Sequence, residues 1–377
     1  MNNPDKKTAD LIDRLTESNV NFALYRLPWT DACHLVLQKS NDIEKLDSLY
    51  ELNERKGFVF APFIPNSKHK VLIIRPDIMA YDWEEIEHEI NAFCKENGIE
   101  HSEKENIEKQ VDDINRDYEK RFYVFKDAMK SGRFSKIVLS RYITEPIENN
   151  FSPLNAFINA CNSYPRMFIY LCHTTASGTW VGSTPEIVLS GNPDSWHTVA
   201  LAGTMSIQNE VVPTEWDIKN CDEQKIVADY IRQTLKKLEL KSKIEEKGPY
   251  TARAGQLVHR KTDFFFTLKE NSKIGLVLEN LHPTPAVCGL PKDDAILFIH
   301  DNEGYDRRYY SGIVGWIDID NGTDLYVNLR CMEIGKNNAR LYAGGGLLPS
   351  SDMETEWEET NRKLATMNKI LKQGNNQ

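Results

Sequence analysis

Apolar residues recur at helical spacing in two parts of the chain. Between residues 106 and 131 the steps are three or four residues long, and between residues 222 and 238 a second stripe has the same spacing. Residues 81–95 are also expected to be helical, with Asn97-Gly98 as the stop. The first stripe consists of Ile107, Val111, Ile114, Tyr118, Phe122, Phe125 and Met129.

Short runs of β-branched and aromatic residues, separated by turn residues, predict strands in the rest of the chain. Residues 135–143 are expected to form a buried strand, and a meander follows it. The other predicted strands are 22–27, 33–37, 57–63, 71–74, 167–173, 179–182, 187–190, 196–200, 324–330 and 341–343. Residues 1–105 carry no chemical constellation. We expect them to complete one integrated fold with residues 106–377 rather than form a separate module.

Charge and cysteine usage narrow the class of protein. The chain has 377 residues, with 46 basic and 56 acidic side chains and a net charge of −10. Such an acidic surface argues against nucleic acid or an anionic membrane as the main partner. The seven cysteines show no zinc or CxxC spacing, which favours free thiols in a reducing cytoplasm. There is no signal-peptide core and no apolar run of about 18 residues, so no membrane span is expected.

Three glycines and a charged helix near the C-terminus form the first candidate site. Gly344-Gly345-Gly346 would let the backbone approach a ligand closely. In the expected helix that follows, Glu356, Glu359 and Lys363 share one face. Two carboxylates on one stripe can bind a hard cation, and the lysine can bind an anion. The alternative is a solvated charged helix face.

Two further side chains permit both a structural and a catalytic interpretation. Lys136 lies near the start of the buried strand, where a lysine usually snorkels to the edge. A desolvated lysine there would instead have a lowered pKa and act as a base. Glu186 follows Pro185 between two predicted strands. It is either a solvated turn residue or, over a pocket, a general acid.

Several other residues also permit both a structural and a functional interpretation. Glu223, in the first turn of the second predicted helix, either stabilises the helix N-terminus or binds a metal. His259 is a lone histidine, which is more often structural. Arg330, at the end of a predicted strand, is a surface residue or, near the glycines, a partner for a carboxylate. Gly203 and Thr204 are expected in a loop that ends the meander.

Nine stretches of the sequence, in this order, resemble those of the chorismate-utilising enzymes. That family includes isochorismate synthase, salicylate synthase, anthranilate synthase component I and aminodeoxychorismate synthase component I. The resemblance runs from about residue 120 to the C-terminus and is closest to isochorismate synthase, because Lys136 stands at that branch's water-activating lysine. The stretches are SKIVLSR, GSTPEIVLSG, LAGT, KNCDEQKIV, LHPTPAVCGLP, YDRRYYSGIVGW, VNLR, YAGGGL and EWEETNRK.

The resemblance implies a fold and an activity. The fold would be α+β, with large antiparallel sheets in a sandwich and helices outside, as in anthranilate synthase component I. The activity would be Mg²⁺-dependent, reversible isomerisation of chorismate to isochorismate, by water attack at C2 and loss of the C4 hydroxyl. The product would feed menaquinone or catechol siderophore biosynthesis, and no protein partner is expected.

The resemblance also assigns roles to residues. Lys136 would be the general base and Glu186 the general acid. Glu223 and Glu359 would bind Mg²⁺, with Glu356 as an acidic neighbour. The substrate-binding positions would be Gly203, Thr204, His259, Ala286, Tyr310, Arg330, Gly344 and Lys363.

The chain departs from the family pattern beside the metal position. Asn220 stands where many members have Asp or Glu, and Gln224 replaces the usual His. Alternatives to isochorismate synthase are a salicylate synthase, which adds pyruvate elimination, and an aminating synthase, which fits poorly with Lys136. A non-catalytic chorismate-binding protein is the alternative outside the enzyme class.

Overall fold

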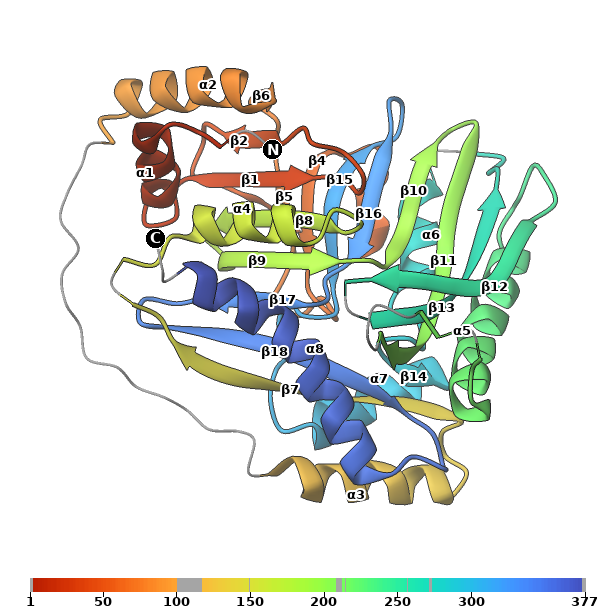
Figure 1. The fold of residues 1–377 in the computed structure, drawn as a ribbon. Coiled ribbons are helices and arrows are strands. Elements are labelled where there is room, and N and C mark those ends of the chain that lie inside the picture. Colours follow the sequence, from red (N-terminus) through yellow and green to blue (C-terminus); the bar gives the residue numbers. More distant parts are fainter. Residues whose placement is uncertain are drawn as a thin grey trace.

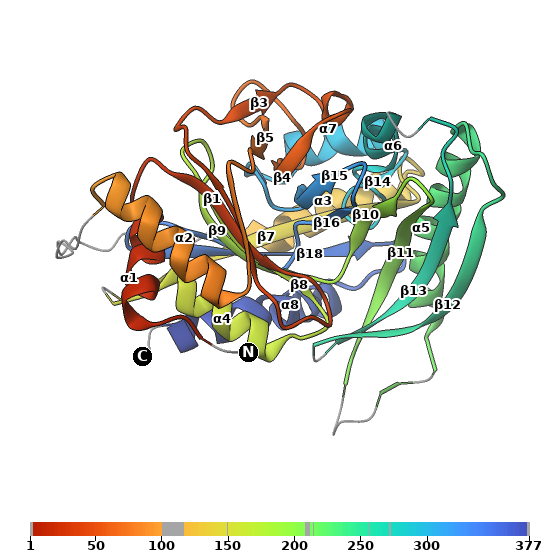
Figure 2. The same ribbon diagram turned by 90° about the horizontal axis from the view of Figure 1, so that it is seen from above.

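The computed structural model describes residues 3–99, 117–148, 150–207, 212–213, 215–255, 257–270 and 273–374. In this part of the chain, two nine-stranded antiparallel sheets pack face to face, and helices cover their outer faces (Figures 1 and 2). The predicted α+β sandwich is therefore confirmed.

The first sheet contains the strand of three glycines in its interior. Its order is β14-β7-β18-β17-β9-β8-β1-β2-β6. Gly344, Gly345 and Gly346 lie within β18 and pair with β7, so they are part of a strand and not of a loop. The strands are β1 (Asn21–Arg26), β2 (His34–Gln38), β6 (Ile78–Tyr81), β7 (Lys136–Pro146), β8 (Phe168–Thr174), β9 (Gly178–Thr184), β14 (Gly289–Leu290), β17 (Cys331–Ile334) and β18 (Asn338–Leu347).

The second sheet has the order β12-β13-β11-β10-β16-β15-β4-β5-β3. The predicted loop at Gly203 and Thr204 is wrong, because β11 continues through both residues. A bulge there gives Gly203 a φ of +75°, which favours glycine. The strands are β3 (Glu44–Leu46), β4 (Lys56–Ala61), β5 (Val71–Ile74), β10 (Ile187–Asn192), β11 (Ser195–Ser206), β12 (Glu245–Ala254), β13 (Leu257–Phe266), β15 (Ile313–Asp318) and β16 (Thr323–Val327).

The helices agree with the predictions where the apolar stripes are strongest. α2 and α5 match the predicted helices 81–95 and 222–238, although α5 begins at Ile218 and so places Glu223 in its second turn. α3 confirms the end of the helix predicted over 106–131, and residues 106–116 lie outside the described part. The helices are α1 (Lys6–Leu15), α2 (Trp83–Glu96), α3 (Tyr118–Lys130), α4 (Pro153–Ser163), α5 (Ile218–Lys237), α6 (Ile274–Leu281), α7 (Lys292–Asn302) and α8 (Met353–Gly374), with a short 3₁₀ helix, η1 (Leu49–Leu52).

An aromatic layer fills the space between the sheets. Phe168 of the first sheet stacks on Tyr326 of the second at 4.4 Å between ring centres. Helices α1, α2, α4 and α8 form a separate apolar core with the outer face of the first sheet, and α5 and α6 do so on the second. Residues 3–99 supply β1, β2 and β6 to the first sheet and β3 to β5 to the second, so this segment extends both sheets.

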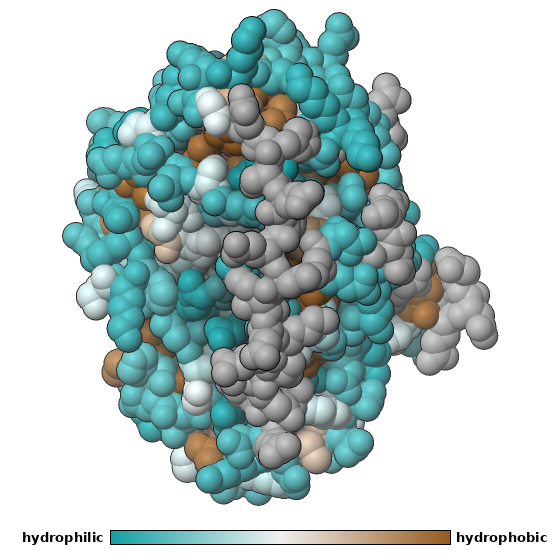
Figure 3. Space-filling view, turned by 90° about the vertical axis from the view of Figure 1, so that its left-hand side faces the viewer, coloured by the Kyte–Doolittle hydropathy of each residue, from teal (hydrophilic) through white to brown (hydrophobic). Residues whose placement is uncertain are grey.

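One face of the molecule is largely polar (Figure 3). The face over α1 and α2 is mostly hydrophilic, with small separated hydrophobic areas (Figure 3). Within the described ranges, none of the helices combines the length and the apolar character that crossing a bilayer requires.

A buried ion pair fixes the strand that begins with Lys136. Arg307 donates to Glu303 Oε2 through Nε and to Oε1 through Nη2, both at 2.6 Å. Arg307 also donates to the carbonyls of Val138 on β7 and Val287 in the loop before β14. Glu303 Oε1 in turn accepts from the Ser140 backbone N–H at 2.7 Å. The pair thus ties the end of α7, the 287 loop and β7 together.

Removing the Glu303 carboxylate should destabilise the protein strongly, because it leaves the Arg307 guanidinium charged and unpaired in the interior. We expect Glu303→Ala to lower the free energy of unfolding by about 3–5 kcal/mol, measured by urea denaturation. Glu119→Ala, an exposed carboxylate on α3, is the matched control and should cost no more than about 0.5 kcal/mol. Equal losses in the two variants would contradict this account.

Candidate active site

A small cavity between the sheets joins most of the predicted site residues. Its volume is about 70 Å³, and ten of the thirteen predicted residues line it. The rest of its wall is mainly apolar, from residues such as Val138, Leu201, Val287 and Leu329, which the sequence did not single out. The ten are Glu186, Gly203, Thr204, Glu223, His259, Ala286, Tyr310, Arg330, Gly344 and Lys363.

Glu186 is buried in this cavity and is not a solvated turn residue. It lies between β9 and β10 with only 3% of its surface exposed. Burial raises the pKa of its carboxyl to about 8, although the charges of Lys136, Lys363 and Arg330 act in the opposite direction. The carboxyl therefore keeps its proton near neutral pH.

Arg330 places a buried positive charge at the same cavity. The predicted strand 324–330 is wrong at its end, because β16 stops at Val327 and Arg330 occupies the connection to β17 with a φ of +45°. Burial lowers the pKa of its guanidinium to about 10, so it stays charged at neutral pH. One of its nitrogens donates to the carbonyl of Ala254 at 3.0 Å.

His259 is neutral, and its tautomer follows from its partners. Its Nε2 lies 2.6 Å from Arg330 Nη2, which can only donate, so Nε2 must accept. Nδ1 then carries the proton and donates to the carbonyl of Gly203 at 3.0 Å. Burial, together with the charges of Arg330 and Lys363, lowers the histidine pKa to about 3. His259 therefore orients Arg330 rather than titrating near neutrality.

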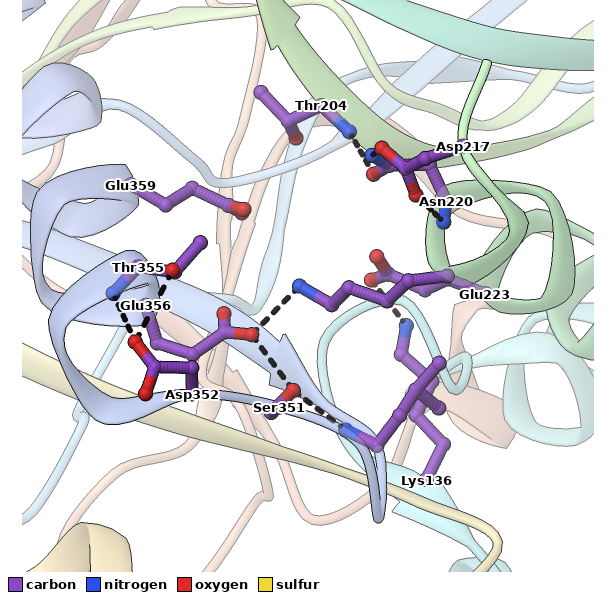
Figure 4. A network of polar contacts seen from close by, with 12 residues as sticks. Lys136, Thr204, Asp217, Asn220, Glu223, Ser351, Asp352, Thr355, Glu356 and Glu359 are labelled. Atoms are coloured by element: carbon purple, nitrogen blue, oxygen red, sulfur yellow. Dashed lines mark hydrogen bonds and ion pairs between the residues drawn. The ribbon is translucent and has the colours of Figure 1, made fainter.

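Lys136 lies directly behind the cavity wall. It is the first residue of β7 and is fully buried, so the snorkelling interpretation is wrong. Its Nζ lies 3.0 Å from Glu223 Oε1 on α5 (Figure 4). The pair fits because residue 346 is glycine: a Cβ there would lie 2.2 Å from Glu223 Oε1 and 2.6 Å from Lys136 Cε.

Glu356 and Glu359 are buried on α8, which rules out a solvated charged face. Both line a groove of about 1070 Å³ beside the cavity, and Thr204 lines the groove and the cavity alike. Lys219 and Ser351 also line this groove. The three predicted residues outside the cavity are therefore close to it: Lys136 behind Glu223, and Glu356 and Glu359 in the groove.

Lysines pair with both α8 carboxylates. Glu356 Oε1 accepts from Lys219 Nζ at 2.6 Å. It also accepts from Ser351 Oγ at 2.7 Å (Figure 4). Lys363 Nζ donates to Glu359 Oε1 at 2.7 Å and to the carbonyl of Gly344 at 2.8 Å. The sequence did not predict a site role for Lys219 or Ser351. Lys219 reaches Glu356 through the packing of distant segments, and Ser351 reaches it through a local turn.

The two carboxylates differ in how readily they ionise. Burial and the nearby charge of Glu359 raise the pKa of Glu356. The pKa of Glu359 is lowered, because the ammonium groups of Lys363 and Lys219 outweigh the effect of burial. Negative charge is therefore held more firmly at Glu359.

The donor set fits a hard cation such as Mg²⁺. Across the described residues, no three His, Cys, Asp or Glu side chains are already gathered as a metal cluster. However, Glu356 Oε2 is buried and meets no hydrogen-bond partner among the residues that the structure describes. A Cβ on Gly345 would lie 3.2 Å from this oxygen and 3.9 Å from Glu359 Oε1. The glycine thus leaves a space bordered by two carboxylates, the ligand type that Mg²⁺ prefers.

The two positions that depart from the family pattern have structural partners. Asn220 Oδ1 accepts from the Thr204 backbone N–H at 2.8 Å, and its Nδ2 donates to Asp217 at 2.6 Å. Gln224 donates to Thr262 Oγ1 at 2.7 Å, so it faces β13. Asn220 thus ties the start of α5 to the bulged strand β11.

We expect Gly346→Ala to lower the free energy of unfolding by about 1–3 kcal/mol, because the new methyl group would overlap the Lys136–Glu223 pair. Gly345→Ala is the matched neighbour, with a nearest contact of 3.2 Å, and should cost less than about 1 kcal/mol. Thermal and urea unfolding of the two variants would test this. An equal or reversed order would show that the pair does not need the glycine.

Comparison with known proteins identifies the group to which the chain is similar. Residues 70–372 match a family profile described as chorismate binding enzyme. The chain is 30% identical over 197 residues to isochorismate synthase EntC of Escherichia coli K12. That match covers 50% of this chain and 50% of EntC, so the chain spans about half the length of this curated relative.

Solved structures show the same fold. The structure of MenF, the menaquinone-specific isochorismate synthase of Escherichia coli, matches with a TM-score of 0.76 at 20% identity, over 98% of this chain and 92% of MenF. Anthranilate synthase component I of Streptococcus pneumoniae matches with a TM-score of 0.67 at 16% identity, over 92% and 89% of the two chains. At these identities the likeness concerns the fold.

Proposed function

The chain belongs to the chorismate-binding enzyme family, and we propose that it is an isochorismate synthase. It would convert chorismate to isochorismate reversibly, for menaquinone or catechol siderophore biosynthesis. The observation that carries the proposal is the cavity in which a protonated carboxyl, Glu186, lies with the charged Arg330 and Lys363. The buried Lys136 stands behind the wall of this cavity.

The charges of the site suit a dianionic substrate on an acidic protein. Arg330 would take one carboxylate of chorismate, held in place by its bonds to His259 and Ala254. Lys363, fixed by Glu359 and the carbonyl of Gly344, adds a second positive charge beside the cavity. Chorismate binding would therefore be strengthened by local charge in spite of the net charge of −10.

Lys136 and Glu186 would carry the two proton transfers. Lys136 would accept a proton from the water whose oxygen bonds to C2. Glu186 would give its proton to the C4 hydroxyl, which leaves as water while the ring double bonds shift. Water is added once and released once, so the reaction is a net isomerisation. The raised pKa of Glu186 supplies the protonated acid that this step needs.

Mg²⁺ would be held by Glu223, Glu356 and Glu359, and when bound it would neutralise the ring carboxylate of chorismate. The free oxygen of Glu356 and the space over Gly345 support this assignment. The lysines that now pair with these carboxylates would have to share or release them.

The groove beside the cavity would be the entrance. A cavity of about 70 Å³ is smaller than the 300 Å³ or so at which small-molecule pockets begin. The groove of about 1070 Å³ shares Thr204 with it and is open to solvent. Chorismate would therefore enter past α8 and widen the cavity as it binds.

Turnover of chorismate with Mg²⁺ and without ammonia, followed by chromatography, tests the proposal. We expect isochorismate from the unaltered protein and a loss of at least about 100-fold in kcat for Lys136→Ala and for Glu186→Gln. Glu119→Gln, on the exposed face of α3, is the control and should retain full activity. EDTA should abolish turnover, and added Mg²⁺ should restore it.

Each alternative function gives a different result. Salicylate as the main enzymatic product would identify a salicylate synthase. An aminated product formed only with ammonia would mean that Lys136 has been assigned the wrong role. Chorismate binding without turnover would indicate a non-catalytic binding protein, and the proposal would be wrong.

The pKa of Glu186 predicts a pH dependence. Its folded-state pKa of about 8 lies above the ordinary 4.5. The folded protein therefore binds this proton more tightly, and its contribution to stability is lost as the pH rises from 4.5 to 8. Glu186→Gln removes the loss, so the variant should be stabilised relative to the unaltered protein by roughly 2–4 kcal/mol more at pH 8.5 than at pH 4.5. Urea denaturation at both pH values, together with a kcat/KM that falls above about pH 8, would check this. A pH-independent difference would mean that Glu186 titrates normally.

A further inference from the structure

A second pocket, outside the site described above, is lined by α8 and by Arg253, Gly255 and Leu257 at the facing ends of β12 and β13. Its volume is about 640 Å³, within the range of small-molecule sites. The 163–167 segment after α4 and the end of β11 complete its wall. Among the described lining residues, it shares Ser206 and Arg362 alone with the groove that holds Glu356 and Glu359.

Four basic side chains line this pocket: Arg166, Arg253, Arg362 and Lys369. None of the described lining residues is acidic, although acidic residues outnumber basic ones in the chain as a whole. Arg362 and Lys369 lie one above the other on α8, seven residues apart. Over the described ranges, Arg166, Arg362 and Lys369 form no ion pair with a carboxylate. The pocket therefore concentrates positive charge on an acidic protein, which favours an anionic ligand.

The walls between these charges are apolar. The apolar lining residues are Tyr164, Pro165, Met167, Ile207 and Leu257. A simple inorganic anion would leave this surface unused, whereas a ring would bury it. The basic groups come from α4's exit, β12 and α8, on different sides of the pocket. Charges on different sides suit a ring with two separated anionic groups.

The pocket touches the residues that hold Arg330. Met167 Sδ lies 4.0 Å from Arg330 Nη1, and the carbonyl that Arg330 binds belongs to Ala254, next to the lining residue Gly255. A ligand in the pocket would thus be separated from the catalytic cavity by Met167 and the β12–β13 turn.

We propose that this pocket binds a cyclic carboxylate dianion at a site separate from the catalytic cavity. Its carboxylates would bind Arg166 on one side and Arg362 and Lys369 on the other, and its ring would lie against Met167 and Leu257. The ligand has the same chemistry as the proposed substrate, so it is either chorismate on its way to the cavity or a separate ring carboxylate that acts on the enzyme.

Calorimetric titration of the whole protein with isophthalate, a benzene ring with two carboxylates, tests the binding. Arg166→Gln with Lys369→Gln removes two charges of the pocket and leaves Arg362, which also lines the groove. We expect this variant to bind isophthalate about tenfold more weakly. Lys236→Gln with Lys237→Gln removes two exposed charges from α5, and it should bind as the unaltered protein does.

Four outcomes would overturn the proposal: no binding of isophthalate, equal binding by the two double variants, equal binding of the neutral isophthalamide, or equally tight binding of inorganic phosphate. None of these measurements needs turnover, so the result stands even if the proposed reaction is wrong. Thermal unfolding of both variants checks that each is folded.

Measuring chorismate turnover distinguishes the two sources of the ligand. This experiment rests on the proposed function. If chorismate passes through the pocket, the pocket variant should show a lower kcat/KM, with a loss that shrinks at high salt. If a separate ring carboxylate binds, kcat/KM should be unchanged and inhibition of turnover by isophthalate should weaken in the pocket variant.

Discussion

Three lysine–glutamate pairs with buried carboxylates hold the site together, and the arrangement of the surrounding elements depends on them. Buried carboxylates close together repel one another and lose hydration, so each needs a compensating charge. Here Glu223, Glu356 and Glu359 each have a lysine nitrogen within 3.0 Å, and two of the three pairs join different elements. The pairs are Lys136–Glu223 between β7 and α5, Lys219–Glu356 between α5 and α8, and Glu359–Lys363 within α8.

Glycines in the neighbouring strand leave the space that these ion pairs need. Gly346 leaves room for the first pair, and Gly345 faces the carboxylates of α8. Both belong to β18, which is held against β7 along its length. The buried Glu303–Arg307 pair fixes β7 from the other side. The ion pairs, the pairing of β7 with β18 and the glycines of β18 therefore constrain one another. A substitution in one of them should disturb the others.

The sequence predicted the features that arise from local pattern or from a whole motif. The stripe of Phe122, Phe125 and Met129 gave α3, and the resemblance gave a set of residues that do converge on one cavity. The loop predicted at Gly203 was wrong because pairing with β13 keeps the chain extended there. A glycine marks both loops and close-packed strands, and only the distant partner strand decides between them.

Long-range contacts explain what was missed at the site. The role of Lys219 could not be predicted, because nothing in its own segment reveals that Glu356, far along the chain, lies 2.6 Å away. The β12–β13 hairpin, which carries His259, was not recognised either. Its first strand is polar and exposed, with the pattern EEKGPY, so no alternation marks it as a strand. The burial of Glu186 could not be predicted either, because the apolar residues that cover it come from distant segments of the chain.

The position of β18 in the first sheet has a consequence for biosynthesis. β18 and α8 follow every other described element along the chain, yet β18 lies between β7 and β17. During synthesis, the edges of β7 and β17 that pair with β18 therefore stay unpaired until β18 has been made. Such edges are templates for association with other chains. The nascent protein should thus be prone to association through these edges until β18 has been made and has paired with both strands.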